Sequence, residues 1–204
     1  MKNLLIFCLL ITGLISKAQQ TTGYKIGDVV ADFKLKNING KQVSLADYKK
    51  AKGFIVIFTC NTCPYAVAYE NRIIALNEKY ASKGYPVIAI NPNDPGAQPA
   101  DTYDKMQQKA SDKGFTFPYL SDPDHLVTKQ FGAARTPHVF VIQKTAKGRL
   151  IEYIGAIDDD TENTNPNKVN YVEDAVNALS TGKKPLVTNT KAIGCTIKWK
   201  KQGA

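Results

Sequence analysis

The sequence predicts an α/β protein with a central mixed β-sheet flanked by helices on both faces. The 204-residue chain is long enough for one domain with its own core. Two apolar segments, 54–58 and 87–90, have the composition of strands buried on both faces, and an amphipathic segment separates them. Two later strand-like segments, 138–142 and 150–154, are typical of an antiparallel hairpin.

The first 18 residues have the pattern of a secretory signal peptide. Lys2 supplies a positive charge, an apolar segment follows, and Ser16 and Ala18 place small residues before a cleavage point. The apolar segment is too short to span a bilayer, which needs about 20 residues. We therefore expect cleavage near Ala18 and export to the periplasm or another extracytoplasmic space, without stable insertion in a membrane.

The mature domain is expected over residues 24–185, with a C-terminal tail over 186–204. Asn39-Gly40 predicts the turn of a small hairpin. The strands 54–58 and 87–90 flank a helix, so they should be parallel with a right-handed crossover. The remaining expected elements are a helix over 101–113, a short strand over 117–120, a short helix that ends at Phe131 and an amphipathic helix over 169–179.

The formal charge of +9 does not indicate a nucleic-acid partner. The chain has 27 Lys and Arg residues against 18 Asp and Glu. Its lysines are scattered, and no basic stripe alternates with aromatic residues. A solvated basic surface is therefore the expected role of the excess charge.

Cys60 and Cys63 are two residues apart and follow the buried strand 54–58. A helix N-terminus favours negative charge, so we expect a lowered pKa for the Cys60 thiol, which would act as the attacking nucleophile. Cys63 would resolve the mixed disulfide formed at Cys60. Pro64 fits the first helical turn. A structural disulfide, inert thiols and a metal site are the alternatives to redox chemistry.

Thr136-Pro137 stands directly before the strand that begins at His138. An X–Pro bond can be cis where its surroundings hold it so. A cis bond here would leave the backbone of Thr136 open to pair with an extended substrate segment. Proline at the start of a strand is also common without any such role. Together with the dithiol, the pair predicts a substrate-binding site.

The dithiol and the Thr-Pro pair together resemble the thioredoxin superfamily over about residues 24–182. The segment from Ile26 to Phe33, with Leu45 and Tyr48 after it, is similar to the redoxin branch. That branch includes the alkyl hydroperoxide reductase/thiol-specific antioxidant family and exported thioredoxin-like reductases. The segment from Thr59 to Tyr65 is similar to a peroxiredoxin-like subgroup with a C-x-x-C dithiol. The resemblance implies a thioredoxin fold, redox-active Cys60 and Cys63, and a cis Pro137 beside them.

The chain departs from the peroxiredoxin pattern. The peroxiredoxin motif P-x-x-x-T-x-x-C does not fit this sequence, whether its cysteine is aligned with Cys60 or with Cys63. The family's arginine would fall near Pro137, and Arg135 is displaced from that position. These departures disfavour efficient peroxidase activity.

The chain also departs from the thioredoxin pattern, in which a buried carboxylate lies beneath the dithiol. The strand 54–58 offers no such group. A proton acceptor must therefore come from elsewhere, and Glu70 or water is the candidate.

The sequence therefore predicts an exported thiol–disulfide oxidoreductase with a Cys60/Cys63 couple, no cofactor and no metal. Its partners would be protein thiols and disulfides or a small peroxide, together with an electron donor. One alternative is a peroxiredoxin-like thiol peroxidase with an antioxidant role. Another is a Cu(I)-binding thioredoxin-fold chaperone that uses the thiols and His138. Copper-delivering proteins of this fold space their cysteines one residue further apart, which disfavours the second alternative.

Cys195 is the third cysteine that remains after export, since Cys8 lies in the signal peptide. It is a possible second resolving cysteine or an intermolecular one. Its neighbours Ile193, Ile197 and Trp199 are typical of a docking strand, so we expect a packed or idle residue. The run Asp158 to Asp160 is expected to be a solvated loop rather than a cation site.

Overall fold

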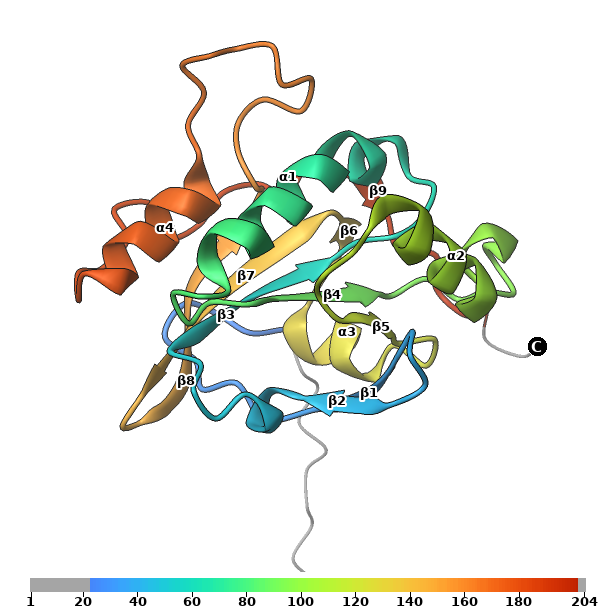
Figure 1. Ribbon diagram of the computed structural model, residues 1–204, viewed down its shortest axis with the longest axis horizontal. Helices are drawn as coiled ribbons and strands as arrows, with labels where there is room; N and C mark the ends of the chain where they lie inside the picture. The colour runs from blue at the N-terminus through green and yellow to red at the C-terminus, as the bar shows by residue number, and fades with distance from the viewer. Residues whose placement is uncertain (1–22, 202–204) are drawn as a thin grey trace, which may run out of the picture.

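The computed structural model describes residues 23–201, so the expected signal peptide lies outside the described residues. A seven-stranded mixed sheet runs through the centre in the order β2-β1-β5-β4-β3-β7-β8 (Figure 1). The predicted α/β class is confirmed. The strands are β1 (Lys34–Asn37), β2 (Gln42–Ser44), β3 (Gly53–Phe58), β4 (Val87–Asn91), β5 (Tyr119–Ser121), β7 (His138–Thr145) and β8 (Gly148–Gly155).

Strand β3 lies in the interior of this sheet, between β4 and β7. It pairs in parallel with β4, as predicted, and antiparallel with β7. Phe58 ends the strand with Ile90 on one side and His138 on the other. All six residues of β3 are buried, which explains its continuous apolar sequence. The chain continues from β3 to β4 and β5 on one side and later returns to β7 on the other. This reversal of strand order makes the carboxyl end of β3 a topological switch point, where α/β proteins commonly bind ligands.

Helices cover both faces of the sheet, as the sequence predicted. The helices are α1 (Pro64–Tyr80), α2 (Tyr103–Lys113), α3 (Leu126–Phe131) and α4 (Tyr171–Ser180). Helices α1 and α4 pack on one face, and α3 with the N-terminal segment packs on the other (Figure 1). None of the helices within residues 23–201 is both long and apolar enough to cross a membrane.

The C-terminal tail returns to the sheet instead of leaving it. Two residues of the tail form β9 (Cys195–Thr196), which pairs antiparallel with β6 (Arg135–Thr136) in a second small sheet. Ile197 of the expected docking strand is only 3% exposed, whereas Ile193 and Trp199 are 46% and 42% exposed. Gly194 lies so close to the carbonyl group of Thr136 that a Cβ atom would collide with it.

The acidic loop after β8 is not simply a solvated loop, and that expectation is wrong for Asp158. The Asp158 carboxylate is buried and accepts from the guanidinium of Arg72 at 2.7 Å. Lys168 is 3.0 Å away, and the hydroxyl of Tyr69 donates to the same group at 3.0 Å. These partners fasten the loop to α1.

Candidate active site

The cysteine motif lies at the junction of β3 and α1. The chain leaves β3 after Phe58, and α1 begins at Pro64 with Cys63 as its N-cap. Pro64 therefore occupies the first helical position, where its missing N–H has no intrahelical partner to lose. Cys60 lies three residues before the N-cap. The cysteine on the helix N-terminus is thus Cys63 rather than Cys60.

Cys60 is a free thiol and only 5% exposed. Its Sγ is 3.2 Å from the hydroxyl oxygen of Thr136. Burial raises the pKa of this thiol, and the negative charge of Asp101 raises it further. The hydrogen bonds from Thr136 and from the backbone N–H groups of Thr62 and Cys63 lower the pKa, but by less. The expected lowered pKa is therefore wrong, because Cys60 lies before the helix N-terminus and is buried.

Cys63 is joined to Cys195 by a disulfide, with the two Cα atoms 6.1 Å apart and a sequence separation of 132. The Sγ of Cys63 also lies 3.3 Å from the carbonyl oxygen of Thr136. Cys195 is packed, as expected, but it is not idle, because it is bonded to Cys63. The disulfide present is not the expected one within the C-x-x-C motif, since Cys60 has no covalent partner within residues 23–201.

The Thr136–Pro137 bond is cis, as the resemblance implied. Thr136 is buried and contacts both Cys60 and Cys63, so the two expected parts of the site do come together. Its backbone is not open, however. Thr136 pairs with Cys195 in the β6–β9 ladder, so the tail occupies the edge that was expected to receive a substrate segment.

Asp101 is a buried acid of the site that the sequence did not single out. It accepts from the backbone N–H of Asn61 at 2.7 Å, and from the amides of Asn93 at 2.7 Å and Asn91 at 3.2 Å. The available signal was the presence of Asn91 and Asn93 close to Asp101 in the 91–101 segment. This network fixes the loop between Cys60 and Cys63 to the end of β4.

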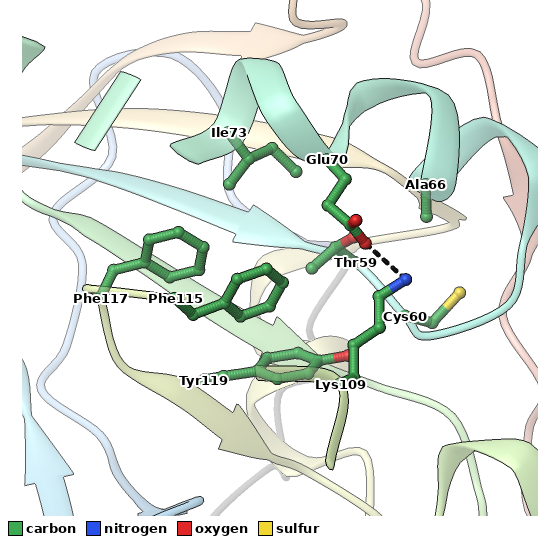
Figure 2. Close-up of a pocket in the computed structure, with 9 residues that line it drawn as sticks. All are labelled: Thr59, Cys60, Ala66, Glu70, Ile73, Lys109, Phe115, Phe117 and Tyr119. Atoms are coloured by element: carbon green, nitrogen blue, oxygen red, sulfur yellow. Dashed lines mark ion pairs between the residues drawn. The ribbon is translucent and has the colours of Figure 1, made fainter. Parts of the chain in front are cut away.

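A small cavity of about 10 Å³, near the minimum for one water molecule, lies beside Cys60 (Figure 2). Glu70 projects into it from α1 and forms ion pairs with Lys109 and Lys113 of α2. Lys109 also donates to the carbonyl of Asn61 at 3.1 Å. Glu70, the candidate proton acceptor, thus shares a cavity with Cys60, with its charge paired to two ammonium groups. The cavity is lined by Thr59, Cys60, Ala66, Glu70, Ile73, Lys109, Phe115, Phe117 and Tyr119.

An open groove of about 180 Å³ approaches the three cysteines from another side. It is the space through which a small reactant can reach the sulfur atoms. The other residues that line it are Thr62, Pro64, Asn93, Gln98, Thr196 and Lys198.

His138 is not gathered with the cysteines. Its Nδ1 accepts from the backbone N–H of Ala134 at 3.4 Å, its ring packs on Phe140, and burial lowers its pKa to about 4. Within the described part of the chain, no group of three or more His, Cys, Asp or Glu side chains could hold a metal ion. The Cu(I) alternative therefore lacks its third ligand.

Arg135 holds the tail. Its guanidinium donates to the carbonyl of Gly194 at 2.9 Å, directly before β9. Arg135, which is displaced from the position of the peroxiredoxin arginine, thus contacts the tail backbone.

The sheet, the helix that follows the cysteine motif and the cis proline beside it define a thioredoxin-fold oxidoreductase of the redoxin branch. The model of the AhpC/TSA family matches residues 26–151, and the chain belongs to that family. The resemblance identified from the sequence is confirmed.

Individual relatives agree with this assignment. The chain is 26% identical over 135 residues to thiol-disulfide oxidoreductase ResA of Geobacillus thermodenitrificans, covering 65% of this chain and 71% of that protein. It is 27% identical over 141 residues to "Putative peroxiredoxin MT2597" of Mycobacterium tuberculosis, covering 69% and 83%. The crystal structure of hypothetical protein SMc02350 from Sinorhizobium meliloti superposes with a TM-score of 0.80 at 32% identity, covering 87% of this chain and 96% of that one.

Proposed function

We propose that the protein is an exported thiol–disulfide oxidoreductase in which Cys60 and Cys63 are the working redox pair. One observation carries the proposal: the free thiol of Cys60 and the disulfide of Cys63 both contact Thr136. Thiol–disulfide exchange requires a thiol within reach of a disulfide sulfur. The pattern of residues 1–18 supports export.

The surroundings of the two sulfurs favour different roles from those expected at first. A thiolate on Cys63 would lie at the N-terminus of α1, where the helix dipole stabilises negative charge. Cys60 is buried and its pKa is raised, so it holds its proton more strongly. Cys63 is therefore the better attacking and leaving sulfur toward a substrate, and Cys60 is the better resolving thiol.

Insulin reduction in the presence of dithiothreitol tests this function. Cys63→Ser should reduce the rate to that of dithiothreitol alone, because no mixed disulfide with substrate can form. Thr62→Ser is a matched control in the same loop, since it keeps the hydroxyl that accepts from Gln98. Full activity in Cys63→Ser would disprove the proposal.

Export is tested by expressing the full chain and determining the mass of the mature protein. Cleavage after Ala18 should leave a chain that begins at Gln19. A mature protein that retains Met1 to Ala18 in the cytoplasm would contradict export and leave the redox chemistry untouched.

A thiol peroxidase is the second candidate, favoured by the AhpC/TSA match and the peroxiredoxin-like relative. Consumption of hydrogen peroxide with a thiol donor distinguishes the two functions. A rate no faster than that of a free thiol would remove this candidate. The engagement of Arg135 with Gly194 leads us to expect that slow rate.

A further inference from the structure

Three cysteines, rather than two, are gathered at the carboxyl end of β3. Cys60, Cys63 and Cys195 pack in one cluster and line the same groove. Cys60 and Cys63 are only 5% and 7% exposed, whereas Cys195 is partly exposed. A reactant that enters from outside thus has better access to Cys195 than to the other two.

The tail that carries Cys195 is fastened on both sides of it by contacts that do not involve sulfur. Before β9, the backbone N–H of Thr190 donates to the carbonyl of Ile154 at 3.0 Å. After β9, Ile197 is buried in the core, and the N–H of Lys198 donates to the side chain of Asn93 at 2.8 Å. Cys195 should therefore stay beside Cys63 after their bond opens.

We propose that Cys195 is a third redox cysteine, which takes the disulfide over from Cys60 and at which an external thiol opens it. This inference rests on the proposed function of Cys60 and Cys63 and adds a resident partner to it. The C-x-x-C motif would thereby be connected to the surface without movement of the tail.

The transfer between the two disulfides is a balanced exchange. The thiolate of Cys195 attacks Sγ of Cys63 in the Cys60–Cys63 disulfide, so that the Cys63–Cys195 bond forms and the Cys60–Cys63 bond breaks. Cys60 leaves as a thiolate and takes up the proton that Cys195 released. No external oxidant or reductant is consumed, and the raised pKa of Cys60 favours its protonation after it leaves.

The second step uses an external thiol as the reductant. Its thiolate attacks Sγ of Cys195, which forms a mixed disulfide there and breaks the bond to Cys63. Cys63 leaves as a thiolate at the N-terminus of α1, a position that stabilises it as a leaving group. A second external thiol then releases Cys195 as a thiol and departs as the oxidised dimer of the reductant.

The tail also restricts which thiols can act. Because β9 pairs with β6, an extended polypeptide cannot form the same pairing with Thr136. The remaining access is the groove beside Thr62, Gln98 and Lys198, which suits a low-molecular-weight thiol. Glutathione is therefore a suitable probe.

Mapping of disulfides by mass spectrometry tests the transfer. After oxidation of the mature protein with one equivalent of diamide, wild type should yield both Cys60–Cys63 and Cys63–Cys195 peptides. Cys195→Ser should yield only the first, and Cys60→Ser only the second. If wild type contains only the Cys60–Cys63 peptide and Cys195 is always alkylated, the inference is wrong although the proposed function stands.

Two isoleucines of the tail provide a matched pair. Ile197→Ala removes a buried anchor, whereas Ile193→Ala removes a side chain that is 46% exposed. The first should shift the ratio of the two disulfides several-fold toward Cys60–Cys63, and the second should leave it as in wild type. Equal ratios in all three proteins would show that tail docking does not position Cys195.

The point of attack is tested in oxidised Cys60→Ser, where only the Cys63–Cys195 bond can form. Limited glutathione followed by acid quenching should give an adduct on Cys195. An adduct on Cys63 would overturn this step. Loss of insulin reduction in Cys63→Ser is the separate test of the proposed function, so the two failures can be told apart.

Discussion

Two buried aspartates, Asp158 and Asp101, are each 3% exposed but differ in the groups that surround their negative charges. Asp158 lies between the cations Arg72 and Lys168. Asp101 accepts hydrogen bonds only from neutral amide groups among the residues described, and its charge raises the pKa of Cys60. The first arrangement fastens a loop, whereas the second leaves a negative charge that acts on a reactive thiol.

The difference separates structural from functional use of one residue type. A buried carboxylate paired with cations has little influence on groups beyond its partners, because the opposite charges cancel at a distance. A carboxylate that accepts hydrogen bonds only from neutral amides keeps its full negative charge, which still acts on ionisable groups nearby. The following substitutions test this distinction, from the largest expected effect to the smallest.

Arg72→Met should lower the free energy of unfolding by about 3–5 kcal/mol, because it leaves Asp158 buried without its guanidinium partner. Urea denaturation measures this change. Lys79→Met is the matched control, since its ion pair with Glu173 is exposed and should contribute less than about 1 kcal/mol. Insulin reduction should be unchanged in both variants. Equal stability losses would contradict the structural role assigned to Asp158.

His138 is a third buried ionisable residue, and it is stable in the folded protein because it remains neutral. Its pKa falls to about 4 in the folded state, below the value of roughly 6.5 in an unfolded chain. Its contribution is therefore fully present above pH 6.5 and is lost as the pH falls toward 4, which amounts to about 3 kcal/mol. Unfolding measured from pH 7 to pH 4 should show this loss in wild type and a smaller one in His138→Gln. Parallel curves would show that His138 does not cause the acid sensitivity.

Asp101→Asn should lower the pKa of the Cys60 thiol, because it removes a negative charge that opposes thiolate formation. Alkylation with iodoacetamide at fixed pH, in a Cys63→Ser, Cys195→Ser background, should become a few-fold faster. Asp104→Asn, at an exposed position of α2, is the control and should leave the rate unchanged. If the alkylation rate is unchanged in Asp101→Asn, the charge of Asp101 does not influence the reactivity of Cys60.

Much of the fold was predictable because local patterns encode it. The continuous apolar sequence of β3 and β4 and the Asn39-Gly40 turn all predicted elements that the structure contains. The two-residue strand β6 was missed, since its partner β9 lies about 60 positions further along the chain. No local periodicity records such a pairing.

The site was predictable in its parts but not in its connections. Cys60, Cys63, Thr136 and Pro137 do meet at one place. The disulfide to Cys195 joins positions 132 apart, and spacing alone could not reveal it. The raised pKa of Cys60 depends on burial by distant segments and on Asp101, which local reasoning about a helix N-terminus leaves out.

Gly194 gives the redox site a dependence on backbone clearance. Its Cα packs against the Thr136 carbonyl with no room for even a methyl group. A mutation of Gly194 to any larger residue would push β9 away from β6. It would thereby move the sulfur of Cys195 away from that of Cys63. Directed evolution for an altered ratio of the two disulfides would therefore be expected to select changes at Gly194, a position without a side chain, charge or redox chemistry of its own.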